Sequence, residues 1–146
     1  MAMKVLLADD SAVMRKIIRR LLEEVEVSSI VEAADGAEAV ASFNAGRFDL
    51  VLTDWNMPNK SGLEVVREIR ATGSAVPIIM ITTEAEKERI ADAVLAGASD
   101  YLVKPFDQAK LRGMLESHVK AKAGDSSDWL PLMVATSTPK SKWAGR

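Results

Sequence analysis

Residues 50–54 read Leu-Val-Leu-Thr-Asp, a short apolar run that ends in a carboxylate. The run shows no alternation of apolar and polar side chains, so a strand formed here has both faces buried. After a loop, Leu63, Val66 and Ile69 recur at the spacing of a helix. A buried strand followed by an amphipathic helix is the repeating unit of a parallel α/β sheet.

The same unit recurs on both sides of this stretch. Ser11 is a good N-cap for a first helix, Asp35 and Asp107 are cap or turn residues, and one helix is predicted over residues 84–96, ended by Gly97. Right-handed crossovers then favour a doubly wound α/β fold with five parallel strands and five helices. The predicted strands are residues 5–8, 30–33, 50–53, 78–81 and 101–103.

Composition places the chain among ordinary globular proteins. It has 146 residues, 48% of them hydrophobic, a formal net charge of -2 and no cysteine. Disulfides and thiol chemistry are therefore excluded, and no global field favours nucleic acid or anionic lipid. No apolar run reaches the length of a membrane span and no secretory signal is evident, so a cytoplasmic protein is expected.

The composition changes at Gly124. We predict one domain over residues 1–123 and a tail or linker over residues 124–146, which is rich in Ser, Thr, Lys and Pro. The apolar run 129–134 leaves two functions open for this tail. It is either a linker, for example to a further domain, or a segment that docks on the surface of a domain in cis or in trans.

Polar side chains follow four of the predicted strands. Asp9 and Asp10 end the first, Asp54 the third, Thr82 the fourth and Lys104 the fifth. The carboxyl ends of parallel strands meet at one edge of the sheet, so these side chains are expected to converge there.

The chemistry of this set favours a hard divalent cation. Clustered carboxylates repel one another unless a cation shares their site, and Mg²⁺ prefers oxygen ligands. An ammonium and a hydroxyl beside them make a phosphoryl-transfer site with Asp54 as the nucleophile. Taken singly, Asp9-Asp10 could equally be a helix cap, and Lys104-Pro105 could be a rigid turn at the end of a strand. The occurrence of all these polar residues at one edge of the sheet favours the phosphoryl-transfer site.

These motifs resemble the receiver domains of two-component response regulators, most closely the stand-alone chemotaxis regulators of the CheY type. The resemblance covers about residues 3–122 and implies a flavodoxin-like sheet with strand order 2-1-3-4-5. It rests on Asp9-Asp10-Ser11, the run from Asp54 to Asn59, Thr82 with Glu84-Ala85, and the run from Gly97 to Phe106.

The resemblance also implies a role for each site residue. Asp54 is the phosphoacceptor and receives its phosphoryl group from a phosphohistidine of a sensor histidine kinase. Asp10, Asp54 and the backbone carbonyl of Asn56 bind Mg²⁺ directly, and Asp9 holds the ion through water. Lys104 pairs with the phosphoryl group, and the Lys104-Pro105 bond is expected to be cis.

Thr82 and Tyr101 are implied to be the switch pair. The hydroxyl moves toward the phosphoryl group and the ring turns inward, which changes an output face made of the fourth helix, fifth strand and fifth helix. A downstream target protein, with a flagellar motor switch as one candidate, would bind this face. Asn56 and Glu84 are expected to tune dephosphorylation and to give a short-lived phosphorylated form.

Two other functions remain open. The chain is alternatively a receiver fragment of a larger regulator, or a Mg²⁺-dependent phosphatase with an aspartyl-phosphate intermediate, although that class normally carries its nucleophile after the first strand. No helix-turn-helix pattern follows residue 122, so no nucleic-acid partner is expected. No membrane partner is expected either, because no apolar run is long enough to span one. A monomer or weak dimer is expected.

Three further features are predicted to be structural. Trp55 is expected at the rim of the site. His118 is expected to be a partly exposed residue of the last helix, outside the acidic crevice. The basic face from Arg15 to Arg20 is expected to be solvated.

Overall fold

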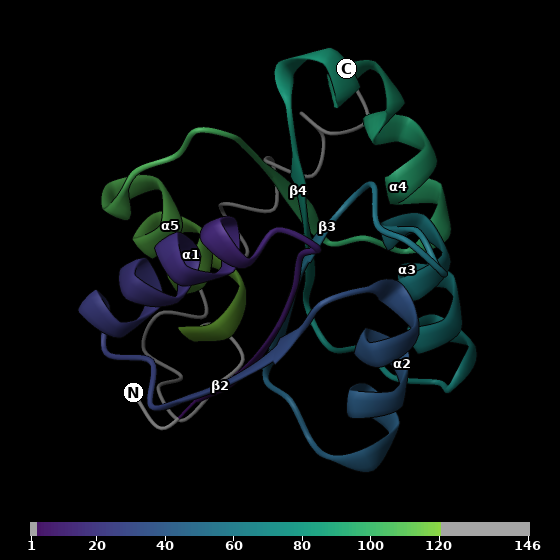
Figure 1. Cartoon of the computed structure of the whole chain (residues 1–146), viewed down its shortest axis with the longest axis horizontal. Helices are drawn as coiled ribbons and strands as arrows, with labels where there is room; N and C mark the ends of the chain where they lie inside the picture. The colour runs from purple at the N-terminus through teal and green to yellow at the C-terminus, as the bar shows by residue number, and fades with distance from the viewer. Residues whose placement is uncertain (1–2, 121–146) are drawn as a thin grey trace, which may run out of the picture.

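Five parallel strands form one sheet at the centre of the structure, a computed structural model that describes residues 3–120 (Figure 1). Their order is β2-β1-β3-β4-β5, which confirms the predicted fold. The predicted tail lies outside the described residues, so the domain boundary at residue 123 stays a prediction. The strands are β1 (Lys4–Ala8), β2 (Ser29–Ala33), β3 (Leu50–Asp54), β4 (Ile78–Thr82) and β5 (Asp100–Val103).

The predicted caps begin the helices. The Ser11 hydroxyl accepts a hydrogen bond from the backbone N–H of Met14, and the Asp35 and Asp107 carboxylates cap α2 and α5 in the same way. Each side chain satisfies a backbone donor that the helix itself leaves unpaired. The helices are α1 (Ala12–Glu24), α2 (Gly36–Ala45), α3 (Gly62–Ala71), α4 (Ile90–Ala96) and α5 (Gln108–Leu115).

Two helices differ from the prediction. The single helix expected over residues 84–96 is a 3₁₀ helix, η1 (Glu84–Arg89), followed by the shorter α4. None of the six residues of η1 is buried, so no apolar contact with the sheet favours the α form over the tighter one. The last helix leaves α geometry at Leu115 and continues as the wider turn η2 (Glu116–Lys120).

Both faces of the sheet are buried. Val5 and Leu7 of β1 pack with Ile18 of α1 and Leu111 of α5, whereas Leu6 and Ala8 join the cluster beneath α2, α3 and α4. Figure 1 shows the same two layers of helices on opposite sides of the sheet. Full burial of each large apolar side chain contributes about 1.5–3 kcal/mol, so this two-sided core accounts for the uninterrupted apolar strands.

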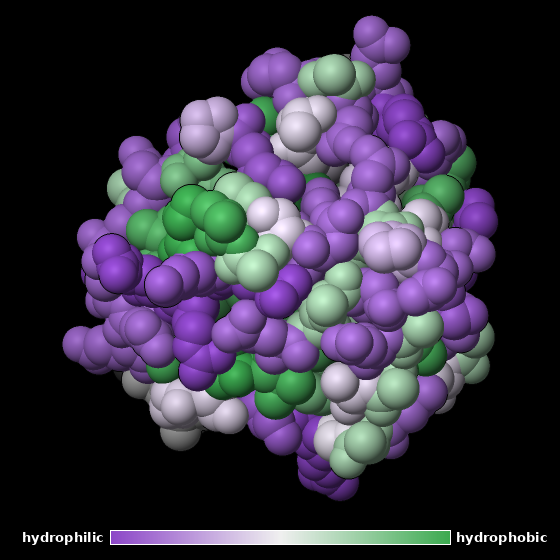
Figure 2. Space-filling model, in the orientation of Figure 1, coloured by the Kyte–Doolittle hydropathy of each residue, from purple (hydrophilic) through white to green (hydrophobic). Residues whose placement is uncertain are grey.

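Apolar surface remains on α1. Val13 is 69% exposed and Ile17 48%, and Figure 2 shows apolar side chains gathered over the region where Figure 1 places α1 and α5. Of the helices among residues 3–120, none has the length and apolar character needed to cross a membrane. A hollow of about 130 Å³ lies between α1 and the segment that follows β5. It is lined by Met14, Ile17, Ile18, Leu21, Lys104, Pro105 and Phe106.

Gly62 fixes the loop that follows β3. Its N–H donates to the carbonyl oxygen of Trp55 at 2.7 Å, which turns the chain back over the end of the strand. A Cβ at this position would lie 2.1 Å from the backbone oxygen of Asp54 and 3.1 Å from Sδ of Met80. Only glycine allows this close approach.

Gly62→Ala is therefore expected to lower the free energy of unfolding by about 1–3 kcal/mol, the usual cost of overpacking. Gly113→Ala is the matched control, because a Cβ at Gly113 of α5 would meet no described atom within 4 Å. That change is expected to raise stability by about 0.5–1 kcal/mol through better helix propensity. Chemical denaturation measures both; equal stability of the Gly62→Ala and native chains would contradict the packing argument.

Candidate functional site

The strand order brings the predicted acidic residues together. β2 and β3 lie on opposite sides of β1, so the chain leaves β1 and β3 in opposite directions and opens a crevice between their carboxyl ends. Ala8 of β1 pairs with Thr53 of β3, which brings the next residues, Asp9 and Asp54, to the same level at this edge. The convergence expected from the sequence is therefore a consequence of the β1–β3 register.

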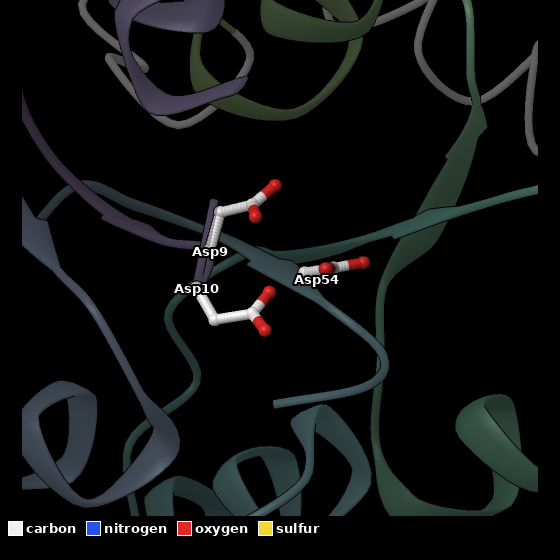
Figure 3. A group of neighbouring side chains, drawn as sticks. All are labelled: Asp9, Asp10 and Asp54. Atoms are coloured by element: carbon white, nitrogen blue, oxygen red, sulfur yellow. The ribbon is translucent and has the colours of Figure 1, made fainter. Parts of the chain in front are cut away.

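The carboxylates of Asp9, Asp10 and Asp54 form a cluster. One oxygen of each lies within 4.8 Å of the others, and Figure 3 shows all three side chains extending toward the same side of the strand ends. Asp9 and Asp54 are buried, with 0% and 8% of their surface exposed, whereas Asp10 is exposed. The cluster thus has a buried floor and one wall open to solvent.

Only one carboxylate oxygen of Asp9 accepts a hydrogen bond from the described residues. Its Oδ1 accepts a hydrogen bond from the N–H of Ser11 at 2.8 Å, and its backbone oxygen accepts one from Nη1 of Arg15 at 2.7 Å. Arg15 is thus drawn from the predicted solvated face of α1 toward the site. The Oδ2 atom of Asp9 is buried and accepts no hydrogen bond from residues 3–120. A buried carboxylate oxygen without a donor fits a site that takes a cation.

Asp54 lies between opposing electrostatic influences. Burial raises its pKa above the ordinary value and the charge of Asp9 adds to this, while Lys104 and the N–H of Trp55 lower it. Nζ of Lys104 lies 3.4 Å from Oδ1 of Asp54 and 3.8 Å from Oδ2 of Asp9. The same Oδ1 of Asp54 accepts the Trp55 hydrogen bond at 2.8 Å. A divalent cation would favour the ionised form that a nucleophile requires.

Thr82 and Tyr101 lie on the same side of the sheet. Met80 of β4 pairs with Tyr101 of β5, and both contact the core beneath α3 and α4. Thr82 lies two residues after Met80 in β4, so its side chain points to the same face of the sheet. The Thr82 hydroxyl is buried and has no hydrogen-bond partner among the described residues. Tyr101 is half-buried. The hydroxyl is therefore available to a new acceptor at the carboxyl end of the sheet.

Asn56 and Glu84 are placed differently from one another. Asn56 is exposed, and its amide donates to Oε2 of Glu86. Glu84 is 76% exposed at its side chain and pairs with Lys87 at 3.9 Å. The contact of Asn56 with Glu86 was not foreseen, although the spacing of Thr83 and Glu86 is that of a capping box, which marks Glu86 as a residue that turns back toward the strand end.

The prediction for Trp55 was wrong. It is fully buried in the cluster beneath α2, α3 and α4, and the guanidinium carbon of Arg89 lies 4.5 Å from its ring centroid. The loop after β3 turns back tightly at Gly62 and places the indole in the core. No residue pattern near Trp55 predicts this burial.

Two other predictions are confirmed. The Lys104-Pro105 bond is cis. His118 lies outside the acidic cluster, where its Nε2 contacts Oδ2 of Asp100 at 3.0 Å, at the opposite end of β5 from Lys104.

Comparison with known proteins agrees with this geometry. Residues 5–116 match the response regulator receiver domain. The chain is 41% identical over 116 residues to chemotaxis protein CheY-3 of Vibrio cholerae serotype O1. This alignment covers 78% of this chain and 89% of CheY-3.

Two solved structures are similar throughout the described fold. The chemotaxis response regulator CheY4 of Vibrio cholerae has a TM-score of 0.73 at 36% identity and covers 80% of this chain and 98% of its own. The receiver domain of a sensor histidine kinase from Pseudomonas aeruginosa PAO1, with a magnesium ion coordinated in its active site cleft, has a TM-score of 0.75 at 34% identity and covers 82% and 99%. The sequence match, the strand order and the acidic cluster lead to one conclusion: this chain belongs to the response regulator receiver domain family and has chemotaxis proteins of the CheY type among its relatives.

Proposed function

We propose that this chain is a Mg²⁺-dependent switch that accepts a phosphoryl group on Asp54 from a sensor histidine kinase. Membership of the receiver family supports a phosphoacceptor role in two-component signalling, and receiver domains are phosphorylated switches rather than classical enzymes. The likeness to CheY proteins supports a cytoplasmic regulator of chemotaxis or motility. The observation that carries the proposal is the contact of Lys104 with both Asp54 and Asp9 beside a third carboxylate.

The acidic cluster fits Mg²⁺. Asp10, Asp54 and the backbone carbonyl of Asn56 would hold the ion, and Asp9 would hold it through water. When bound, the ion neutralises the carboxylates and the oxygens of the incoming phosphoryl group. The buried Oδ2 of Asp9 accepts no hydrogen bond from residues 3–120, and Lys104 approaches it only to 3.8 Å, so this atom best supports a cation here.

The transfer itself requires little from the protein beyond positioning. A carboxylate oxygen of Asp54 attacks the phosphorus atom, the bond from phosphorus to the imidazole nitrogen of the kinase breaks, and that nitrogen keeps the electron pair. Lys104, already 3.4 Å from Asp54, binds a phosphoryl oxygen as charge accumulates there. The buried floor formed by Asp9 and Thr82 limits access of water from below.

Phosphorylation would then change the packing around Thr82. Its hydroxyl donates to a phosphoryl oxygen, and the space it leaves admits the ring of Tyr101. The output face formed by α4, β5 and α5 would bind the downstream target. Leu95 of α4, which is 86% exposed, gives this face an apolar contact that supports a protein partner. A flagellar motor switch is the candidate for this partner.

Incubation with acetyl phosphate and Mg²⁺ is expected to add one phosphoryl group per chain, as measured by intact-protein mass spectrometry. Asp54→Asn is expected to abolish the labelling because the amide is not a nucleophile. Asp92→Asn is the matched control, since Asp92 is an exposed carboxylate on α4. Labelling that survives in Asp54→Asn would refute the acceptor assignment, and continuous turnover of a simple phosphomonoester would favour the phosphatase alternative.

Thr82→Ala is expected to leave labelling largely intact and to abolish the conformational response. Its hydroxyl makes no hydrogen bond within the described residues, so its loss removes only the contact with the phosphoryl group. Hydrogen exchange of residues 90–103, compared with and without acetyl phosphate, reports the response. Thr82→Ser retains the hydroxyl and is expected to respond like the native chain; an undiminished response in Thr82→Ala would remove Thr82 from the switch.

The phosphorylated form is expected to be short-lived, because Asn56 and Glu84 offer a polar and acidic path for the attacking water. Loss of the label with time in Mg²⁺ measures the lifetime. A label that persists for many hours would contradict this expectation.

A further inference from the structure

The geometry of η1 places Glu86 and Arg89 on the same side of the helix. A 3₁₀ helix has three residues per turn, so side chains three positions apart eclipse one another. An α-helix would rotate the second side chain away from the first by part of a turn. Both side chains face the loop that begins immediately after Asp54.

Glu86 joins the ends of two neighbouring strands. Its Oε1 accepts a hydrogen bond from the N–H of Thr83 at 3.0 Å, directly after β4, and its Oε2 accepts one from the side-chain amide of Asn56, two residues after β3. The first contact alone would be an ordinary helix cap. The second gives the same carboxylate a role at the loop beside the acidic cluster.

Arg89 makes the parallel contact with Trp55. Its guanidinium lies over the indole ring, 4.5 Å from the ring centroid, and the ring is fully buried. The backbone N–H of Trp55 in turn donates to Oδ1 of Asp54 at 2.8 Å. Glu86 and Arg89 thus contact the two consecutive residues that follow Asp54.

We propose that Glu86 and Arg89 form a clasp that holds Trp55 and Asn56 and thereby prepares the site for Mg²⁺. The clasp rests on the proposed function. Its effect is exerted at the Asn56 carbonyl and at the Asp54 carboxylate, whose geometry depends on the conformation of residues 55–56. Glu86 and Arg89 are positioning residues, because each acts through the loop residue that it contacts. Residues that orient metal ligands in this way commonly change metal affinity by about 10–100-fold when they are removed.

The sign of the Arg89 effect separates the clasp from plain electrostatics. Removal of a cation near an acidic cluster would strengthen Mg²⁺ binding if charge alone mattered. Loss of the Trp55 contact releases the loop and weakens binding. Removal of Glu86 weakens Mg²⁺ binding whether the clasp or charge alone is responsible, so Glu86→Gln is the variant that separates the two. The glutamine carries no charge, but it can accept a hydrogen bond from the Thr83 N–H and donate one to a flipped Asn56 amide.

Isothermal titration of the full chain with MgCl₂ tests the clasp. Glu86→Ala is expected to raise the Kd for Mg²⁺ by about tenfold, Glu86→Gln to restore it close to the native value, and Arg89→Ala to raise it severalfold. Glu88→Ala is the matched control, since it removes the same charge from an exposed neighbour on η1, and its Kd is expected to stay close to native. Urea denaturation of each variant checks that the fold is retained.

Each contrary outcome is decisive. Any of three results would overturn the clasp in favour of simple charge. These are tighter Mg²⁺ binding in Arg89→Ala, Mg²⁺ binding in Glu86→Gln as weak as in Glu86→Ala, and a loss of affinity in Glu88→Ala equal to that in Glu86→Ala. A native chain that binds Mg²⁺ with the same Kd as Glu86→Ala overturns the clasp and leaves the proposed function standing. A native chain that does not bind Mg²⁺ overturns the clasp together with the metal part of the proposed function.

Discussion

The repulsion among three carboxylates at one end of the sheet is the constraint on which the rest of the site depends. Asp9 and Asp54 are removed from water and lie within 4.8 Å of each other and of Asp10. Such an arrangement is unfavourable for the free protein: burial, and then the charge of Asp9, raise the pKa of Asp54. Lys104 and a few backbone N–H groups offset it only in part. The negative charge that remains favours the binding of a cation at the cluster.

The sheet supplies the rigidity that holds these charges together. Each central strand is buried on both faces, so β1, β3 and β4 are fixed by two clusters of apolar side chains. The polar residues lie immediately after or at the last position of these strands, where the register sets their relative height. Gly62 adds a constraint from the loop, because its close approach to the Asp54 carbonyl permits no side chain.

The connection η1 joins β4, which ends beside the acidic cluster, to α4, a helix of the proposed output face. η1 has no buried residues and is held instead by polar and cation–π contacts to the loop after β3. Contacts of this kind are exchanged at lower cost than core packing, which suits a segment that changes its arrangement. If occupancy of the site shifts α4 through Glu86 and Arg89, as the clasp implies, then a partner that binds α4 changes the affinity of the site in turn.

Sequence alone determined the strands, most of the helices and the set of polar side chains at the carboxyl edge of the sheet. The apolar strands, the caps at Ser11, Asp35 and Asp107, and the order of acidic residues, hydroxyl and ammonium along the chain were all predicted, because they depend on local periodicity and on where a strand ends. The tertiary structure decided the burial of Trp55, the 3₁₀ form of η1 and the partner of Asn56. Each of these depends on a segment that arrives from elsewhere in the fold: the return of the loop to Gly62, the absence of an apolar surface beneath residues 84–89, and the meeting of the ends of β3 and β4. Local pattern fixes which face of an element is apolar, but only the packed neighbours fix which atoms meet.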